Sequence, residues 1–307
     1  MKILVLGAAA GGGYPQWNCN CRQCGGLRRG TTRAFSRTQS SIAVSQDGLD
    51  WVLLNASPDL GQQIRDNAVL HPRAEPRDTP IRAIVLMDAQ LDHVTGLLSL
   101  REGPPVELYC TPGVLEDLTV GLPILPTLRH YCGVHWNEVS VVGNNTSAEF
   151  TVPALPRLRF TAVAVAGRAP PYSARRDAPA VGDNIALIID DIGTGERLFY
   201  APGLAHVDQA AQEALAGATC VMVDGTFWTE DEMLTAGLSR KMAAEMGHLP
   251  QSGPNGMLVM LTALAARRKI LIHINNSNPI LDHDSAEHLE LQRHGIEVAH
   301  DGMEIDL

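Results

Sequence analysis

The stretch that decides the fold reads IVLMDAQLDHVTGLLSL, residues 84–100. It starts as an apolar run, breaks at the polar segment DAQLDH, residues 88–93, and resumes with the spacing of an apolar helix. Two carboxylates, an amide and an imidazole fall within this short segment. Such a density of polar groups between a buried strand and a buried helix is costly unless the groups bind something. The stretch therefore predicts a strand, a ligand-binding connection and a helix, and it raises the question of whether the ligand is a metal.

The composition is that of a folded protein with a substantial core. The chain has 307 residues, of which 45% are hydrophobic, and this is enough to bury a full core. No Ser/Gly-rich or charged linker divides the chain, so we expect a single domain over residues 1–307. Residues 167–183 are expected to form a long loop, and long loops inside compact domains are often functional.

Charge and cysteine usage argue against several classes of protein. The net charge of −10 disfavours a nucleic-acid surface, which needs a basic patch. No segment has the roughly 20 apolar residues of a membrane span, and the N-terminus lacks the features of a signal peptide. Three of the six cysteines are clustered and three are scattered, which is a poor disulfide framework. We therefore expect a cytoplasmic protein without nucleic-acid or membrane partners.

Apolar runs and helical patterns alternate along both halves of the chain. We expect strands at residues 2–7, 40–46, 51–57, 81–87, 106–110, 157–165, 184–191, 196–202, 219–227 and 269–279. We expect helices at residues 57–67, 93–102, 111–120, 206–217, 253–268 and 282–295. Two successive halves of this kind favour an α/β fold with two packed sheets and helices outside, an αββα sandwich. A doubly wound parallel sheet is the alternative, and periodicity alone does not separate the two.

The segment GAAAGGG, residues 7–13, follows the first expected strand. A dinucleotide-binding fingerprint needs a different glycine spacing, a helix directly afterwards and an acidic residue about 20 positions on. No acidic residue lies between Lys2 and Asp47. We interpret the segment as a loop that lets the backbone pass close to another group.

The segment CNCRQC places Cys19, Cys21 and Cys24 in one tight loop. Thiolates at this spacing can point at one centre, and Zn²⁺ takes four such ligands in a tetrahedron. A structural zinc is favoured over an iron–sulfur cluster because no fourth cysteine is close by. Arg28 and Arg29 follow the loop and are expected to help stabilise the thiolate charge. The candidates for the fourth ligand are Asn276, His294 and His300.

Two further apolar runs end in a possible metal ligand. VMVDGTF ends its apolar part at Asp224, and ILIHINN does so at His273. Together with residues 88–93 these are three polar strand ends, and open sheets place their ligands at the carboxyl ends of strands. A lone buried Asp or His is costly when it has no partner. Three such ends in one chain favour a metal site.

The combination of these segments resembles the metallo-β-lactamase superfamily, with its αββα fold. Within it, the chain is similar to the PqqB family of pyrroloquinoline quinone (PQQ) biosynthesis. The resemblance spans nearly the whole chain. It is carried by KILVLGAAAGGGYPQWNCNC at 2–21, RTQSS at 37–41, DAQLDHVTGL at 88–97, VDGTFW at 223–228, MGHLPQSG at 246–253 and IHINNSNP at 272–279.

The chain departs from the superfamily signature H-x-H-x-D-H, which binds two metals. Asp88 and Gln90 stand where two histidines of the first metal site are expected, and no histidine occurs within residues 162–172. The resemblance therefore implies a lost first site. It implies a retained second site whose ligands are Asp92, His93, Asp224 and His273. Two imidazoles with carboxylates and open positions suit non-haem Fe(II) as well as Zn²⁺.

The resemblance to the PqqB family implies oxygen-dependent hydroxylation of the tyrosine of a Glu–Tyr-derived precursor, with other PQQ-biosynthesis proteins as possible partners. A zinc hydrolase of the phosphodiesterase type that keeps one metal is an alternative, but the lost histidines argue against it. A carrier for PQQ or its precursor is a third interpretation, which would make the chain a transport protein and not an enzyme.

Three residues are candidates for a catalytic role. His248 stands in MGHLPQSG, where the similar histidine of hydrolytic relatives serves proton transfer, or it forms a hydrogen bond to a ligand. Asp88 and Gln90 are candidates to form hydrogen bonds with the metal ligands or the substrate. Guanidinium groups match carboxylates bidentately, so loop arginines are candidates for substrate binding. These are Arg33, Arg37, Arg168, Arg175 and Arg176.

Overall fold

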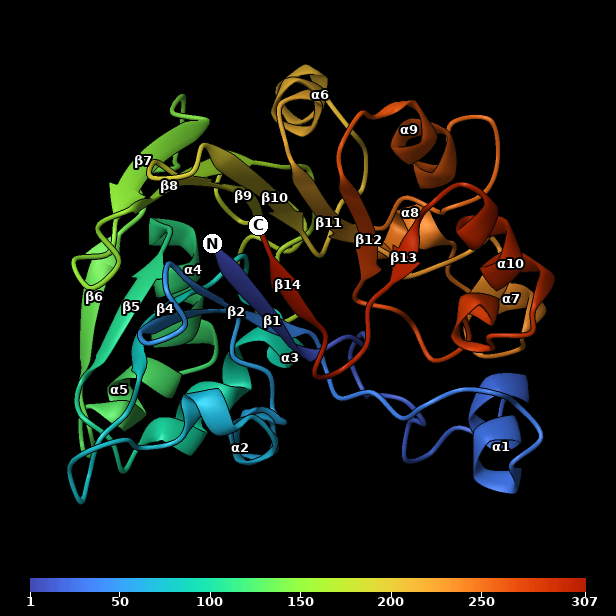
Figure 1. Cartoon of the computed structure of the whole chain (residues 1–307). Helices are drawn as coiled ribbons and strands as arrows, with labels where there is room; N and C mark the ends of the chain where they lie inside the picture. Colours follow the sequence, from blue (N-terminus) through green and yellow to red (C-terminus); the bar gives the residue numbers. More distant parts are fainter.

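The computed structural model describes residues 1–307 and has two seven-stranded mixed sheets packed face to face, with helices on the outside (Figure 1). The first sheet has the order β14-β1-β2-β3-β4-β5-β6, and the second has the order β13-β12-β11-β10-β9-β8-β7. In both sheets one half is antiparallel and the other half is parallel. This is the αββα sandwich predicted from the alternating pattern, and not the doubly wound single sheet.

The first sheet consists of β1 (Lys2–Gly7), β2 (Ser41–Ser45), β3 (Trp51–Leu54), β4 (Ile81–Val85), β5 (Val106–Cys110), β6 (Val134–Glu138) and β14 (Glu304–Asp306). The second consists of β7 (Ser147–Thr151), β8 (Leu158–Ala164), β9 (Ile185–Asp191), β10 (Glu196–Ala201), β11 (Cys220–Asp224), β12 (Arg268–Ile272) and β13 (Glu297–Val298). The strands β2, β3 and β11 are buried at every residue, since both faces of each sheet are covered. Strands β6 and β7 were not predicted, because they are largely solvent-exposed and lack an apolar run.

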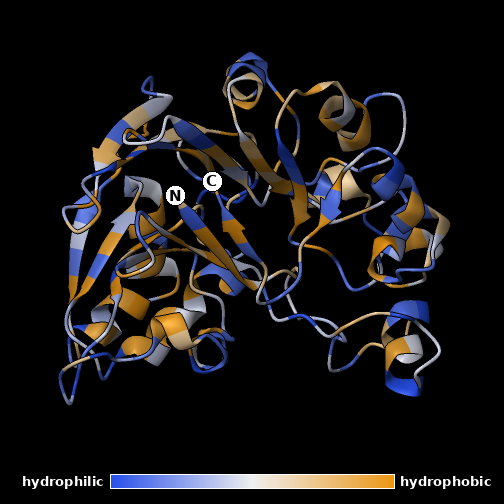
Figure 2. Ribbon diagram, viewed as in Figure 1, coloured by the Kyte–Doolittle hydropathy of each residue, from blue (hydrophilic) through white to orange (hydrophobic).

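Three apolar clusters hold the layers together. The largest contains 30 buried residues and lies between the sheets, with contributions such as Val5, Val85, Phe160 and Met222. The other two lie under the outer helices, one on each sheet. Figure 2 shows the hydrophobic colour along the inner strands and the hydrophilic colour over most of the outer loops. Burial of this kind is the main driving force for the fold.

The helices are short. They are α1 (Arg22–Arg29), α2 (Leu60–Asp66), α3 (Leu91–Val94), α4 (Pro112–Glu116), α5 (Ile124–Leu128), α6 (Gln209–Ala216), α7 (Glu232–Thr235), α8 (Ala243–Met246), α9 (Met257–Ala263) and α10 (Ala286–Arg293). No helix has the length and apolar character needed to cross a bilayer.

The helix predicted at residues 93–102 is a single α-helical turn, α3, followed by a 3₁₀ segment over Thr95–Leu100. Gly96 explains the tight packing here, because a Cβ at this position would lie 2.0 Å from the carbonyl oxygen of Ser57. The backbone after α3 therefore lies directly against the end of β3. This contact holds the polar segment at residues 88–93 close to the sheet.

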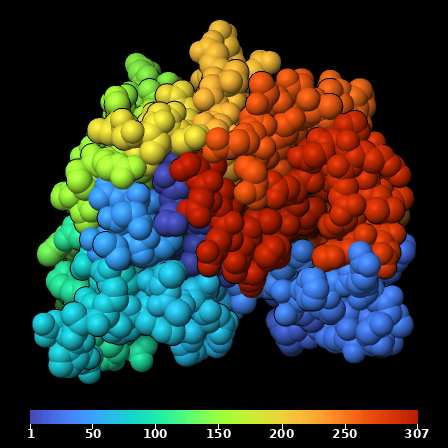
Figure 3. Space-filling view, in the orientation of Figure 1, coloured from blue at the N-terminus to red at the C-terminus, as the bar shows by residue number.

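The N-terminal arm, residues 8–35, leaves the first sheet and lies against the C-terminal third of the chain (Figure 3). Ile274 donates to the carbonyl of Ala8 and accepts from the amide of Ala10, and His283 donates to the carbonyl of Arg33. The arm contains α1, a helix that was not predicted, and Cys21 is the N-cap of this helix. The cysteine loop is thereby attached to the segment that follows β12.

Candidate metal centres

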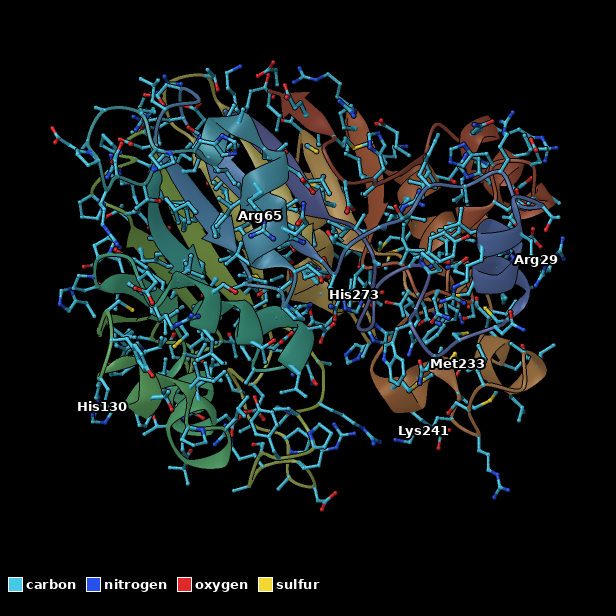
Figure 4. The ribbon with its side chains drawn as sticks, turned by 90° about the horizontal axis from the view of Figure 1, so that it is seen from below. Arg29, Arg65, His130, Met233, Lys241 and His273 are labelled. Atoms are coloured by element: carbon cyan, nitrogen blue, oxygen red, sulfur yellow. The ribbon has the colours of Figure 1, made fainter.

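The polar strand ends meet at one edge of the sandwich. In the second sheet, Asp224 is the last residue of β11 and pairs in register with Ile272, so His273 lies beside it. In the first sheet, β4 ends at Val85 and leads into Asp88 and α3. Figure 4 shows His273 near the middle of the molecule, between the sheets and α1. The carboxyl ends of parallel strands in two facing sheets thus converge on one site.

Asp92, His93 and His273 form the first group, which we name the His–Asp centre. One ligand atom from each residue lies within 4.8 Å of the others. His273 Nε2 lies 3.2 Å from Asp92 Oδ2, and His93 Nε2 lies 3.9 Å from the same oxygen. A Cβ at Gly11 would lie 3.2 Å from Asp92 Oδ2, so the glycine-rich loop passes directly against this carboxylate.

The outer nitrogens of both histidines are held by neighbouring groups. His93 Nδ1 lies 2.8 and 2.9 Å from the two carboxylate oxygens of Asp88. His273 Nδ1 lies 2.9 Å from the hydroxyl of Thr226. Second contacts of this kind fix the ring orientation and raise the basicity of a metal ligand. Both Nε2 atoms are thereby directed toward Asp92.

The buried His93 Nε2 has no hydrogen-bond partner. An orphaned polar atom of this kind is uncommon in a folded protein and calls for a ligand or an ion. Burial lowers the pKa of His93, but the carboxylates of Asp88 and Asp92 outweigh burial and raise it to about 9. The site therefore attracts positive charge, and its donor set fits a divalent metal.

Asp224 belongs to a second group with His248 and His273. Its Oδ1 accepts hydrogen bonds from the amide and the hydroxyl of Thr226, at 2.9 and 2.6 Å. Its Oδ2 accepts from the amide of Leu204 at 2.9 Å and lies 2.7 Å from His248 Nδ1. Burial raises the pKa of Asp224, but the facing imidazole of His248 outweighs it and holds the pKa below the usual range. Asp224 orients His248 here, and its predicted role as a metal ligand stays a prediction.

Thr226 was missed by sequence reasoning. Its hydroxyl contacts Asp224, His248 and His273 and so joins the two groups. The only signal in the sequence is a hydroxyl two positions after a carboxylate at a strand end. His273 itself has a φ of +59°, a conformation that non-glycine residues adopt rarely and that often marks a functional position.

A cavity of about 290 Å³ opens beside the His–Asp centre. Its wall includes Asp88, Gln90, Asp92, His93, His248 and His273, so all of the candidate catalytic residues contact it. Among the predicted substrate-binding arginines, Arg168 and Arg176 line it, and Lys241 does so as well.

The other three arginines lie elsewhere. Arg33 pairs with Asp284 on the surface, and the buried Arg37 donates to the carbonyl of Ala299. Arg175 pairs with Glu116, Asp117 and Asp183. None of the three lines this cavity, and internal contacts hold Arg37 and Arg175 while Arg33 lies on the surface. Their predicted role in substrate binding stays a prediction.

Cys19, Cys21 and Cys24 form the other cluster, and their sulfur atoms lie within 4.8 Å of one another. All three are free of disulfides. Burial raises the pKa of Cys19, but hydrogen bonds from neighbouring groups outweigh it and lower that pKa, whereas burial raises the pKa of Cys21 to about 12. Arg28 donates to the carbonyls of Cys19 and Gln16, so it supports the loop backbone and not a thiolate.

Of the three candidates for a fourth ligand, only Asn276 contacts the cysteines. Its Nδ2 lies 3.1 Å from Cys19 Sγ, 3.8 Å from Cys21 Sγ and 3.3 Å from Cys24 Sγ. His294 contacts Glu290, and His300 contacts the carbonyl of Asp301. We name Cys19, Cys21, Cys24 and Asn276 the Cys centre.

Comparison with known proteins places this site in a family. A family model described as a beta-lactamase superfamily domain matches residues 50–274. Coenzyme PQQ synthesis protein B from Pseudomonas fluorescens strain SBW25 is 54% identical over 308 residues, and the protein of that name from Azoarcus sp. strain BH72 is 55% identical over 309 residues. In both cases the match covers 100% of each chain. This chain belongs to the coenzyme PQQ synthesis protein B family.

Solved structures agree with the family assignment. The 1.98 Å crystal structure of Zn²⁺-bound PqqB from Methylobacterium extorquens is 38% identical, has a TM-score of 0.90 and covers 100% of both chains. A diphosphatase of the PhnP family is 18% identical with a TM-score of 0.67, and it covers 99% of this chain and 96% of its own. The second likeness shows the fold alone. The predicted metallo-β-lactamase fold and the resemblance to the PqqB family are thereby confirmed.

Within this family member, the two residues at the expected first-site positions have other partners. Asp88 binds His93, as described above. The side-chain amide of Gln90 donates to the carbonyl of Arg168 at 3.0 Å. Both side chains line the cavity, and each supports a neighbouring part of the site.

Proposed function

We propose that this protein acts in PQQ biosynthesis as a mononuclear non-haem iron enzyme that hydroxylates the tyrosine ring of a Glu–Tyr-derived precursor. The observation that carries the proposal is the set of Asp92, His93 and His273, with the buried and unpartnered Nε2 of His93 facing the carboxylate. Two histidines and one carboxylate with open positions are the ligand pattern of Fe(II) oxygenases.

Asp92, His93 and His273 would hold the metal. Bound iron supplies the one-electron and O₂ chemistry that side chains lack. The overall reaction replaces one ring hydrogen with a hydroxyl group that contains one atom of O₂. The second oxygen atom leaves as water, with two electrons and two protons from an external reductant and the solvent.

The surrounding side chains supply orientation and proton transfer. Asp88 and Thr226 each hold the outer nitrogen of one metal-binding histidine. His248 has its Nδ1 on Asp224 and lines the cavity. Burial lowers the pKa of His248, but the carboxylate of Asp224 outweighs it and raises that pKa. His248 is therefore suited to exchange a proton with a substrate hydroxyl group.

Hydrolysis by a pair of metals is not the function that this site supports. Two-metal hydrolases clamp the attacking and leaving oxygens between their ions. Here Asp88 is committed to His93 and Gln90 to the carbonyl of Arg168. We expect no useful hydrolysis of phosphodiesters or lactams.

We also propose that the Cys centre binds a structural zinc. The side-chain amide of Asn276 directs its nitrogen toward the three sulfur atoms. Cys19, Cys21 and Cys24 would hold the zinc, and a half-turn of the Asn276 side-chain amide would let its oxygen serve as the fourth ligand. Zinc accepts oxygen ligands as well as sulfur and nitrogen.

The test of the enzyme proposal is product mass. The protein is loaded with Fe(II) without oxygen, and then given a reductant, a Glu–Tyr dipeptide and ¹⁸O₂. We expect one labelled oxygen atom in the tyrosine ring per turnover, none with His93→Ala, and wild-type label with the exposed control His130→Ala. Iron-loaded protein that inserts no label yet binds PQQ tightly would replace the enzyme proposal with the carrier function.

A further inference from the structure

The cavity beside the His–Asp centre contains cations that the protein does not neutralise. Arg168 and Lys241 line its wall, and neither side chain has a hydrogen bond or an ion pair within the protein. The carboxylates on the same wall, Asp88 and Asp92, each contact a histidine. A protein of net charge −10 thus leaves two positive side chains open beside its metal site.

Unpaired cations also occur elsewhere on the surface, for example Arg22, Arg129 and Arg240, but these residues do not line the cavity. Other arginines are neutralised within the protein. Arg157 pairs with Asp191, Arg197 with Asp190, and Arg268 with Glu297. Internal carboxylates satisfy these guanidinium groups. Free cations that border a cavity are instead available for an anionic ligand, because charged groups focus ligands of opposite charge.

The backbone of Arg168 is fastened to the metal-binding segment. Gln90 donates to its carbonyl at 3.0 Å, and Tyr172 donates to the carbonyl of Ala89. Within the loop, Arg176 donates to the carbonyl of Ala169 at 2.6 Å. Gln90 is two positions from Asp92, so the loop that carries Arg168 is tied to the same segment that carries the metal ligands. A site held in this way keeps its geometry better than one on a free loop.

Lys241 comes from a separate part of the chain. It lies between Gly237 and Gly247, which have φ values of +68° and +92°. Figure 4 shows Lys241 and Met233 on the same side of His273. The wall of the cavity also includes Phe227, Met233 and Met246, which offer an apolar surface to a ring. The cavity of about 290 Å³ is close to the lower end of ligand pockets, about 300 Å³, and suits a small molecule.

We infer that Arg168 and Lys241 bind two carboxylates of a small aromatic ligand and hold its ring at the His–Asp centre, with Gln90 as the positioning residue for Arg168. This inference rests on the proposed function for the identity of the ligand. The carboxylates belong either to a tyrosine-containing dipeptide or to the finished quinone, and the recognition chemistry is the same for both. Gln90 thus has a binding role at a position where the superfamily carries a metal-binding histidine.

The test is ligand binding to zinc-loaded protein, in which no turnover occurs. Isothermal titration calorimetry compares Glu–Tyr, its doubly amidated analogue and PQQ. We expect Arg168→Ala and Lys241→Ala each to weaken binding of a carboxylate ligand roughly 10- to 100-fold, as for loss of a hydrogen bond to a charged group. The amidated analogue should bind weakly to the wild type and be insensitive to both substitutions. Arg240→Ala, next to Lys241 but outside the cavity wall, is the matched control.

The test of Gln90 must distinguish a role in ligand binding from a general loss of structure at the site. Gln90→Ala should leave the metal content unchanged and weaken carboxylate binding. The double variant Gln90→Ala/Arg168→Ala should bind the carboxylate ligand about as weakly as Arg168→Ala alone, because both substitutions remove the same contact. Gln90→Glu should not restore affinity, since a carboxylate cannot donate to the Arg168 carbonyl.

Several outcomes separate this inference from the enzyme proposal. If ligand binding depends on Arg168 and Lys241 but no oxygen is inserted, the carboxylate site stands and the proposed hydroxylase function is wrong. If the two substitutions weaken the binding of PQQ but not of Glu–Tyr, the carboxylate site stands and its ligand is the quinone. If the wild type binds neither ligand, or if both alanine variants bind within twofold of the wild type, the carboxylate site is wrong.

Discussion

The two centres of this molecule lie three positions apart at their nearest approach in sequence, His273 and Asn276, yet they are assembled in different ways. The Cys centre takes its three sulfurs from one loop, closed by α1 with Cys21 as the N-cap. The His–Asp centre takes Asp92 and His93 from α3, which follows β4 of the first sheet, and His273 from the residue after β12 of the second sheet. One centre depends on a local loop and the other depends on the packing of the sandwich.

This difference decides how the two centres respond to substitution. Each histidine of the His–Asp centre is held by a further partner, Asp88 for His93 and Thr226 for His273. The cysteines have hydrogen bonds mostly from one another and from Asn276. We expect metal to organise the Cys loop, whereas the fold organises the His–Asp centre before metal binds.

The largest effect should come from removing a ligand of the His–Asp centre. His93→Ala removes one of three ligands and should weaken metal binding there roughly 1000-fold, about 4 kcal/mol, while zinc at the Cys centre stays. Metal analysis after dialysis against a weak chelator measures both, with His130→Ala as the control. Loss of both metals together would show that the two centres are not independent.

Removal of a cysteine should act on stability. Cys21→Ser should lose the zinc of the Cys centre and lower the stability by about 3 kcal/mol, which lowers the melting temperature by roughly 6–12 °C. Cys132→Ser, outside the cluster, should change little. Thermal unfolding with zinc analysis checks the prediction, and full zinc occupancy in a variant with serine at all three positions would contradict the assignment of this centre.

A smaller effect on metal affinity should follow from substitution of a residue that holds a metal ligand in place. Asp88→Asn keeps the size of the side chain but removes the charge that holds His93 Nδ1. Loss of such an outer partner lowers metal affinity about 10- to 100-fold. Competition with a chromophoric chelator measures the change. An unchanged affinity would mean that packing alone orients His93.

The sequence predicted the local features of both centres. The C-x-C-x-x-C spacing grouped the three cysteines, and the apolar runs that stop at Asp88, Asp224 and His273 marked three strand ends that the fold brings to one edge. The αββα fold followed from the alternating pattern together with the family resemblance. These signals are local, because a strand and the residue directly after it are neighbours in the chain.

Contacts that form only through tertiary packing could not be predicted from the sequence. Thr226 joins the two groups of the metal site through its hydroxyl, and Asn276 was one of three equal candidates for the fourth ligand of the Cys centre. The sequence also predicted four metal ligands at the His–Asp centre. The structure separates Asp224 from the other three, because both oxygens of its carboxylate already accept hydrogen bonds. The exposed strands β6 and β7 lacked a buried run to reveal them.

The smallest predicted effect concerns the segment that joins the two centres. Glu232 is buried, and its carboxylate accepts hydrogen bonds from the hydroxyl of Ser277 and the amide of Trp228. The hydroxyl of Ser277 in turn accepts a hydrogen bond from the side-chain amide of Asn275, which lies between the centres, so Glu232 supports this segment through Ser277. Burial raises the pKa of Glu232 to about 7. The folded protein therefore holds a proton at pH values where the unfolded chain, with a pKa near 4.5, has released it.

Stability should accordingly fall as the pH rises between these two pKa values, because the folded state binds more protons than the unfolded state. From pH 5.5 to 7.5 the loss should be on the order of 1.5 kcal/mol. Glu232→Gln removes the titrating group and should abolish this part of the pH dependence, whereas the exposed control Glu75→Gln should keep it. Urea unfolding of zinc-saturated protein across this range measures the difference between the variants. If wild type and Glu232→Gln change in parallel with pH, the carboxyl group of Glu232 titrates normally, and the segment between the two centres is held by Asn275 and Asn276 without a contribution from a protonated Glu232.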